Sequence, residues 1–358
     1  ADAGIVISAS HNSMEYNGIK IFDSRGHKLP DEIEDRIEAI VLDKAEDLPK
    51  PTGAGVGRIV RIKNTVKDYV DFLKGTMDTD LRDIKIAIDC ANGASYEAAP
   101  ILFEALGADV HTMYTTPDGV NINSSCGSTY PKKLQSYVLE ADADIGFAFD
   151  GDADRLIAVD ENGKLVDGDQ IMVMCALDMQ KNKKLKNDTL VTTVMSNLGL
   201  DKAIEQAGLK SEKTDVGDRY VLEKMLECNY SLGGEQSGHV IFLDYNTTGD
   251  GLLTALQVLK VMKHTGKKIS ELAGCMKKYP QVLVNASVRD EKKHAYEDDP
   301  LIQEAIGEIE SIFKDERRVL IRPSGTEPLV RVMIEGTEQR EIEEHAVRLA
   351  KLIEERLS

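Results

Sequence analysis

The strongest constraint on the fold is an apolar run that leads directly into a cluster of acids. Residues 145–149 (IGFAF) carry no polar side chain, and Asp150, Asp152 and Asp154 follow at once. A strand that does not alternate polar with apolar residues is buried on both faces, which is typical of a parallel or mixed sheet covered by helices. The run therefore predicts an α/β domain with a polar loop at the end of a central strand.

The same strand-then-helix pattern occurs elsewhere in the chain. Residues 85–89 read as a strand before a helix over 95–106, and residues 190–195 read as a strand before a helix that ends near Gly208. We therefore expect two related α/β domains with mixed sheets. After residue 279 the order changes to strand, helix, strand, strand and helix, which predicts a C-terminal α+β domain.

Length and turn-forming residues predict several domains. The 358 residues exceed what one compact core usually holds. A segment rich in Pro and Gly, residues 47–57, reads as a first linker, and residues 4–7 read as a strand already under way. We expect an incomplete first domain with the serine loop, a second with the acidic loop, a third with a polar Gly-rich loop and a fourth with a basic loop: residues 1–62, 63–164, 165–276 and 277–358.

Charge and cysteine usage exclude several classes of protein. The formal net charge is −18, which argues against binding to nucleic acid or to an anionic membrane, because both need a basic surface. The cysteines are odd in number and never spaced as CxxC, which argues against a disulfide framework and a zinc site. No apolar run approaches the length of a membrane span. We expect a cytoplasmic protein.

The acidic loop has the spacing of a metal site. Three carboxylates at alternate positions let one loop converge on a hard divalent cation, and without a cation they would repel one another. The spacing also suits an EF-hand calcium loop, with Glu161 at its last position. That loop needs Gly where this chain has Arg155, and it follows a helix rather than a strand. We therefore expect another kind of metal site, in which Arg155 binds a phosphate beside the metal.

Three further loops carry groups suited to a phosphorylated sugar, although each alone fits an ordinary turn or hairpin. Residues 8–12 (SASHN) place a hydroxyl among small residues, and residues 233–239 (GGEQSGH) carry groups that hydrogen-bond sugar hydroxyls. Residues 322–326 (RPSGT) supply a guanidinium group, hydroxyls and backbone N–H groups that suit a phosphate dianion, and Arg331 adds a second guanidinium. Together with the acidic loop, these segments predict one phosphoryl-transfer site.

With these four motifs in this order, the chain resembles the α-D-phosphohexomutases, and within that family most closely the bacterial phosphoglucosamine mutases. Gln236 matches the glucosamine branch, whereas the phosphomannomutase and phosphoglucomutase branch often has Met there. The chain departs from many relatives at Ser13, where Pro is common, and at Ala153, where Gly is frequent. Family members also carry an N-terminal segment with a Gly- and Arg-containing stretch, which is expected here ahead of residue 1.

The resemblance implies a role for each motif. Ser10 would carry the phosphoryl group, and Mg²⁺ would lie between the phosphoserine and the three acids of the loop. Lys20 falls where relatives place a general base, with His11 as the alternative, and Arg155 would steady the transferring group. The sugar would be bound by Glu235, Ser237 and His239, and the non-reacting phosphate by Arg322, Ser324, Gly325, Thr326 and Arg331.

The implied activity is the interconversion of glucosamine 6-phosphate and glucosamine 1-phosphate through a 1,6-bisphosphate intermediate, which would also serve as activator. The product would feed the synthesis of UDP-N-acetylglucosamine and the cell wall. Three alternatives stay open: a phosphomannomutase or phosphoglucomutase, a metal-dependent sugar phosphatase, and a non-catalytic sugar-phosphate or Ca²⁺ binding protein. The only expected partner is the phosphorylated hexosamine, with a homodimer as an open alternative to a monomer.

Overall fold

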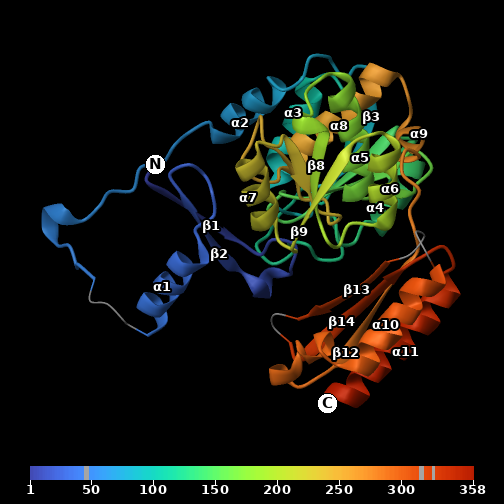
Figure 1. The fold of residues 1–358 in the computed structure, drawn as a ribbon. Helices are drawn as coiled ribbons and strands as arrows, with labels where there is room; N and C mark the ends of the chain where they lie inside the picture. Colours follow the sequence, from blue (N-terminus) through green and yellow to red (C-terminus); the bar gives the residue numbers. More distant parts are fainter. Residues whose placement is uncertain (44–47, 314–317, 325–326) are drawn as a thin grey trace. The chain divides into compact units, whose positions relative to one another are not determined.

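A computed structural model describes residues 1–43, 48–313, 318–324 and 327–358 (Figure 1). The chain divides into two compact units. The first contains Ala1–Met195 and Leu209–Cys275, and the second contains Ser196–Gly208 and Met276–Ser358. Among the helices in these ranges, none is both long enough and apolar enough to cross a membrane.

A mixed sheet, here named the central sheet, forms the core around the acidic loop. Within the described ranges its strand order is β4-β3-β5-β6-β7. β3 pairs in parallel with β4 and β5, and the β5–β6 and β6–β7 pairs are antiparallel. The strand bounds are β3 Lys85–Asp89, β4 Asp109–Met113, β5 Ile145–Phe149, β6 Leu156–Asp160 and β7 Leu165–Val166.

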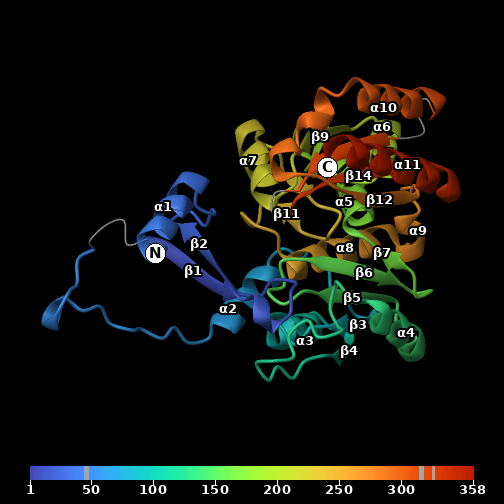
Figure 2. The ribbon, with the colours of Figure 1, turned by 90° about the horizontal axis from the view of Figure 1, so that it is seen from below.

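Helices cover both faces of the central sheet, as the apolar run at its centre predicts. α4 (Lys132–Ala141) packs on the face of β5 that carries Gly146 and Ala148, and α3 (Ser95–Ala105) packs on the opposite face, which carries Phe147. α8 (Gly251–Thr265) lies beside β6 (Figure 2), with Gly251 against Phe149 on the same face as Phe147. All five residues of β5 are buried. Phe147 of β5 stacks on Phe103 of α3, with ring centroids 5.9 Å apart. This packing fixes the end of β5, from which the acidic loop begins.

A second mixed sheet in the same unit has the strand order β11-β10-β8-β9 in the described ranges. β8 pairs in parallel with β9 and β10, and β10 turns back through an antiparallel hairpin into β11. The strand bounds are β8 Thr189–Thr193, β9 Lys210–Thr214, β10 Leu232–Gly234 and β11 Val240–Phe242. The associated helices are α5 Gly168–Lys181, α7 Asp218–Cys228 and α9 Ile269–Ala273.

Helix ends in this region follow ordinary capping chemistry. Asp167 accepts the backbone N–H of Gln170 at the start of α5, and the Gln170 side chain returns to the Asp167 backbone, which completes a capping box. Asp250 caps α8 by accepting the N–H of Leu253. Gly266 ends α8 with a φ of +67°, a conformation that Gly adopts without steric cost.

The N-terminal segment forms a hairpin with a helix beside it. β1 (Ala3–Ser8) pairs antiparallel with β2 (Gly18–Asp23), and α1 (Asp31–Leu42) follows, while α2 (Thr65–Lys74) leads into the central sheet. Ile5, Ile7 and Ile19 of the hairpin are 67–73% exposed. The hairpin therefore buries little apolar surface in the described part of the chain.

The second unit is an α+β module, as the order of elements predicts. In its described residues, the antiparallel strands run in the order β12-β14-β13, and α10 and α11 lie on one face of this sheet (Figure 1). The bounds are β12 Gln281–Ser287, α10 Pro300–Phe313, β13 Arg318–Pro323, β14 Leu329–Glu335 and α11 Gln339–Leu357.

One helix from the middle of the sequence belongs to this second unit. α6 (Leu198–Gln206) begins at Asn197, whose side chain donates to Glu335 Oε1 at 3.0 Å. Glu335 is fully buried, and its other oxygen lies 2.6 Å from Arg318 Nη2. A buried carboxylate that is both paired and hydrogen-bonded holds its partners firmly, because breaking either contact leaves an uncompensated charge.

The sequence predicted most of these elements to within a few residues. The sequence predicted a strand over 318–322 and a basic loop that begins at Arg322, and the structure continues this strand through Pro323. Arg322 lies within β13 and stands opposite Arg331 of β14. Val319, Leu320 and Ile321 are consecutive apolar residues, so the local pattern does not mark where the strand ends, whereas the pairing with β14 does.

The packing of β5 yields a stability prediction. Replacing Phe147 by Ala removes a fully buried ring from the core, and we expect the free energy of unfolding to fall by about 3–5 kcal/mol. Phe72→Ala on α2 is the matched control, because Phe72 is 46% exposed. Urea denaturation followed by circular dichroism measures both, and equal losses in the two variants would contradict this account.

Candidate functional site

The loop after β1 holds Ser10 in a backbone conformation that L-amino acids seldom adopt. The φ of Ser10 is +51°, in the left-handed region. Its N–H donates to Ser8 Oγ at 2.8 Å, and the Asn12 N–H donates to the Ala9 carbonyl at 2.9 Å. Such strain persists only where surrounding contacts hold it, and it is common at functional sites.

The acidic loop touches the serine loop directly. The N–H of Gly151 donates to the carbonyl oxygen of Ser10 at 3.0 Å. A Cβ at Gly151 would stand 2.4 Å from that oxygen, so only Gly allows the two backbones to approach this closely. The structure therefore brings together Ser10 and the acids, which lie 140 residues apart in the sequence.

The three acids form a cluster that could hold a metal ion. One carboxylate oxygen from each of Asp150, Asp152 and Asp154 lies within 4.8 Å of the others. Asp150 is fully buried, and its Oδ1 accepts the N–H of Arg155 at 3.1 Å. Each acid also has a buried oxygen with no hydrogen-bond partner among the described residues: Asp150 Oδ2, Asp152 Oδ1 and Asp154 Oδ1. Buried unpaired oxygens are costly, so this set fits a hard cation that takes oxygen ligands.

The protonation of the cluster reflects its burial. Burial, reinforced by the charges of Asp154 and Asp152, raises the pKa of Asp150 to about 8. Burial would also raise the pKa of Asp152, but the hydrogen bond and charge of Lys20 outweigh it, so that pKa lies below its usual value. Without a cation, Asp150 is therefore mostly protonated at neutral pH.

Lys20 extends from β2 into the acidic loop. Its Nζ lies 2.5 Å from Asp152 Oδ2 and 3.4 Å from Asp154 Oδ2. Burial opposes the charge of Lys20, but the contacts with both acids raise its pKa above the usual value. In this arrangement Lys20 is a cation that offsets the acids, and it is poorly suited to accept a proton.

His11 has the opposite tendency. Its Nδ1 lies 3.3 Å from Ser10 Oγ. Burial lowers the pKa of His11, and the positive charge of Arg155 lowers it further. A neutral imidazole next to the hydroxyl can accept its proton, and it can return the proton when Oγ becomes a leaving group.

The predicted sugar loop is the β10–β11 hairpin, and it adjoins the acidic loop through the backbone. The N–H of Leu156 donates to the Gly238 carbonyl at 3.0 Å, and Arg155 forms an isolated bridge with His239. Glu235 accepts the N–H of Gly217 at 3.2 Å, and Ser237 Oγ lies 3.4 Å from Glu235 Oε2. The hairpin therefore lies beside the acidic loop, with Glu235 half-buried and Ser237 exposed.

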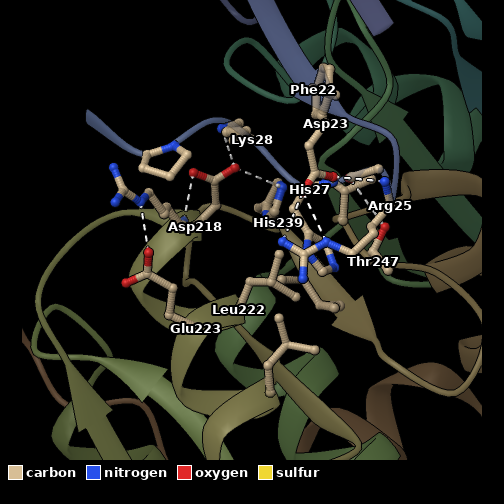
Figure 3. A pocket seen from close by; sticks show the side chains of 16 residues that line it. Phe22, Asp23, Arg25, His27, Lys28, Asp218, Leu222, Glu223, His239 and Thr247 are labelled. Atoms are coloured by element: carbon tan, nitrogen blue, oxygen red, sulfur yellow. Dashed lines mark hydrogen bonds and ion pairs between the residues drawn. The ribbon is translucent and has the colours of Figure 1, made fainter. Parts of the chain in front are cut away.

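His239 is the buried member of this hairpin. Its side chain is 3% exposed, its Nε2 accepts the N–H of Gly249 at 3.2 Å, and the same atom lies 3.6 Å from Asp218 Oδ2. Asp218 in turn lies 2.5 Å from Lys28 Nζ (Figure 3). Beside this trio is a cavity of about 370 Å³, lined by the segment after β2, by α7 and by β11. The first turn of α7 thus links the hairpin of β1 and β2 to His239.

The basic loop lies in the second unit. Ser324 is 6% exposed, its N–H donates to the Leu329 carbonyl at 2.9 Å, and its carbonyl accepts from Lys293 at 2.9 Å. Arg331 lies beside Arg322 across the β13–β14 pair, 3.6 Å from Glu327. Two predicted residues, Gly325 and Thr326, lie outside the described residues. Arg322, Ser324 and Arg331 thus share one end of this sheet.

Sequence reasoning missed three residues that contact the site: Lys28, Asn123 and Asp218. Lys28 and Asp218 pair across 190 residues of sequence. Asn123 lies in an irregular segment and donates to the serine loop. None of the three belongs to a dense motif. Asp218 reads as an ordinary acid in the first turn of a helix, so no local signal distinguishes it.

Comparison with known families covers nearly the whole chain. Four models of the phosphoglucomutase/phosphomannomutase family match in order: the alpha/beta/alpha domains I, II and III match residues 1–47, 67–163 and 167–279, and the C-terminal domain matches residues 283–352. Among solved structures, a phosphoglucomutase/phosphomannomutase family protein from Burkholderia thailandensis superposes with a TM-score of 0.76 at 25% identity, covering 98% of this chain and 77% of that one.

Curated relatives are closer in sequence. The phosphoglucosamine mutase of Ruminiclostridium cellulolyticum is 61% identical over 358 residues, and that of Acetivibrio thermocellus is 58% identical over 357; each alignment covers all of this chain and 80% of the relative. The N-acetylphosphoglucosamine mutase of Aspergillus fumigatus, solved with GlcNAc-6P and magnesium, shares the fold with a TM-score of 0.76 at 21% identity, covering 99% of this chain and 89% of that one. The chain belongs to the phosphoglucomutase/phosphomannomutase family of α-D-phosphohexomutases.

Proposed function

We propose that this chain is a phosphoglucosamine mutase that interconverts glucosamine 6-phosphate and glucosamine 1-phosphate through a phosphoserine at Ser10. One observation carries the proposal: the Ser10 carbonyl accepts a hydrogen bond from Gly151 within the acidic loop, so the loop with the serine and the loop with the three carboxylates are in direct contact. The sugar assignment rests on the relatives that are 58–61% identical, all of which are phosphoglucosamine mutases.

The reaction consists of two phosphoryl transfers. In the first, O1 of glucosamine 6-phosphate gives up its hydroxyl proton and attacks phosphoserine; the bond from phosphorus to Ser10 Oγ breaks, Oγ takes up a proton, and a 1,6-bisphosphate forms. The bisphosphate then turns so that its 6-phosphate faces Ser10. In the second transfer Ser10 Oγ loses its proton and attacks that phosphorus, the bond to O6 breaks, O6 takes up a proton, and glucosamine 1-phosphate leaves while phosphoserine is restored.

His11 is the group that we assign to the Ser10 proton. At 3.3 Å from Oγ and with a lowered pKa, it takes the hydroxyl proton when Oγ attacks and returns it when Oγ leaves. Lys20, the other candidate, is held as a cation by Asp152 and Asp154. We therefore assign Lys20 to charge balance at the acidic loop.

Asp150, Asp152 and Asp154 would hold Mg²⁺, and their unpaired oxygens and mutual spacing fit such an ion. When bound, Mg²⁺ neutralises charge on the transferring phosphoryl group. The fungal relative solved with magnesium and GlcNAc-6P supports this choice of metal. Arg155, whose Nε makes no hydrogen bond within the described part of the chain, would donate to the phosphoryl oxygens.

The remaining predicted residues would bind the parts of the substrate that do not react. Glu235, Ser237 and His239 would hydrogen-bond the sugar hydroxyls, since carboxylate, hydroxyl and imidazole groups can pair with donors and acceptors on adjacent carbons. Arg322, Ser324 and Arg331, together with Gly325 and Thr326, would take the phosphate that is not being transferred. A 1,6-bisphosphate would prime the enzyme by phosphorylating Ser10.

Removal of the nucleophile tests the proposal. In the full-length protein, Ser10→Ala should abolish both the phosphoserine seen by intact mass and the mutase turnover, because it removes the hydroxyl that lies beside His11. Ser13→Ala, an exposed serine on the same loop, is the matched control and should keep wild-type turnover. Turnover by the Ser10→Ala variant would contradict the assignment.

Substrate choice is a separate prediction. With Mg²⁺ and a bisphosphate activator, we expect kcat/KM for glucosamine 6-phosphate to exceed that for glucose 6-phosphate and mannose 6-phosphate by about tenfold or more. A coupled assay with the three sugars in parallel measures this. Preference for mannose or glucose would move the protein to another branch of the family, and release of inorganic phosphate without isomerised sugar would favour a phosphatase.

Metal binding should depend on pH in a stated direction. Because the pKa of Asp150 is about 8 without a cation, Mg²⁺ must displace its proton, and affinity should rise between pH 6 and pH 8 by up to about tenfold per unit. Titration calorimetry in two buffers of different ionisation enthalpy measures both affinity and released protons. Asp154→Asn should weaken binding, and the exposed control Asp83→Asn should not. An affinity that stays constant over this range would contradict the cluster as the metal site.

A further inference from the structure

One buried side chain joins the serine loop to the domain that carries the acids. Asn123 lies in the irregular segment between β4 and α4 and is 5% exposed. Its amide nitrogen Nδ2 donates to the carbonyl of Ser10 at 2.8 Å and to the carbonyl of Asn12 at 2.7 Å. A single amide thus uses both of its hydrogens on the two ends of the turn that contains His11.

The orientation of this amide is dictated by its partners. Carbonyl oxygens only accept hydrogen bonds, so the NH₂ end of Asn123 must face the serine loop. The other end, Oδ1, is buried and has no hydrogen-bond partner among the described residues. An unpaired buried acceptor is destabilising. Asn123 therefore makes two hydrogen bonds to the serine loop, while its Oδ1 has no partner among the described residues. This arrangement favours a role in positioning the serine loop over a role in stabilising the fold.

The backbone of Asn123 is itself held rigidly. Its N–H donates to the Ala91 carbonyl at 2.9 Å, and its φ of +56° is one that Asn tolerates better than most residues. The buried carboxylate of Asp89 accepts the N–H groups of Ala91 at 2.9 Å and Gly127 at 2.8 Å. The support for the amide is thus an extension of strand β3 in the central sheet.

The serine loop needs such support because Ser10 is strained. The Ser10 carbonyl accepts hydrogen bonds from both Gly151 N and Asn123 Nδ2, and these two bonds fix the orientation of the peptide that follows Ser10, a residue whose own φ is positive. Without the amide, the Ser10 carbonyl keeps only its hydrogen bond from the Gly151 N–H. The Asn12 carbonyl loses the hydrogen bond that it accepts from Asn123. The peptide can then relax, which moves Oγ away from its place beside the acidic loop.

We propose that Asn123 is a positioning residue for Ser10: its amide clamps the Ser10 and Asn12 carbonyls and so holds the hydroxyl in line for phosphoryl transfer. The proposal rests on the proposed function of Ser10 as phosphoryl carrier. It assigns a share of the nucleophile's geometry to a side chain between β4 and α4, outside the four motif loops of the proposed site.

The test uses a variant of nearly equal size without donors. Asn123→Asp in the full-length protein with Mg²⁺ presents carboxylate oxygens to the two carbonyls, so it repels where the amide binds. We expect kcat to fall by about 10- to 100-fold, while KM for glucosamine 6-phosphate stays within about threefold, because the sugar-binding residues are untouched. The rate at which the bisphosphate phosphorylates Ser10, followed by intact mass, should fall with kcat.

Asn121→Asp is the matched control on the same segment. The Asn121 amide donates to the Thr116 carbonyl and not to the serine loop, so this variant should keep kcat within about threefold of wild type. Equal losses in both variants would overturn the proposal, and so would wild-type kcat in a folded Asn123→Asp protein. If the Asp variant shows no cooperative melting, the neutral Asn123→Ala variant decides by the same kcat and KM criteria. Absence of turnover in the wild-type protein would instead count against the proposed function.

Discussion

Polar contacts join the serine loop and its hairpin to the acidic loop. Ile5 and Ile7 of β1 and Ile19 of β2 are largely exposed in the described structure. Hydrogen bonds and ion pairs connect β1, β2 and the segment after β2 to the rest of their unit. These link Ser10 to Gly151 and Asn123, Lys20 to the acids, and Lys28 to Asp218. Directional contacts of this kind set distances closely but supply modest stability each. The position of the hydroxyl therefore responds to any change in those few groups.

The rigid partner in this arrangement is the central sheet. β5 is buried throughout and fixes where the acidic loop starts, and β3 fixes Asp89, Ala91 and, through them, Asn123. A site built from the ends of packed strands is more precise than one built from loops alone. Gly151 adds the close approach, because the absence of a Cβ lets the Ser10 carbonyl reach its N–H. The strained backbone of Ser10 is therefore held by contacts with Gly151 and Asn123, which are themselves fixed by the packed strands β5 and β3.

The features that could be predicted from the sequence depend on local patterns, and the features that were missed depend on long-range contacts. The apolar run 145–149 and the acids after it predicted a buried strand and a metal-type loop, because periodicity and charge density are local properties. The family resemblance supplied Ser10 and the branch. Asn123 and Asp218 carry no such signal, since their roles arise from contacts to residues over 100 positions away. The basic loop was predicted to begin at Arg322, yet pairing with β14 extends the strand through both Arg322 and Pro323. Long-range hydrogen bonds and sheet register are the properties that local patterns do not contain.

Under the proposed function, the charge of the site would couple phosphorylation of Ser10 to binding of a cation. With Asp150 protonated, two carboxylates face the cations Lys20 and Arg155, and the local charge is nearly balanced. A phosphoryl dianion on Ser10 would upset that balance, and ionisation of Asp150 would do so further. A divalent cation on the three acids offsets most of this added charge, so the phosphorylated serine and the cation should each favour the binding of the other.

The same argument explains the raised pKa of Lys20. Until a cation binds, Lys20 is the nearest positive charge to the acids, and a cation on those carboxylates would weaken the ion pairs of Lys20 and lower its pKa. The state of Lys20 is therefore linked to the occupancy of the acidic loop, through Asp152, the carboxylate that it contacts most closely.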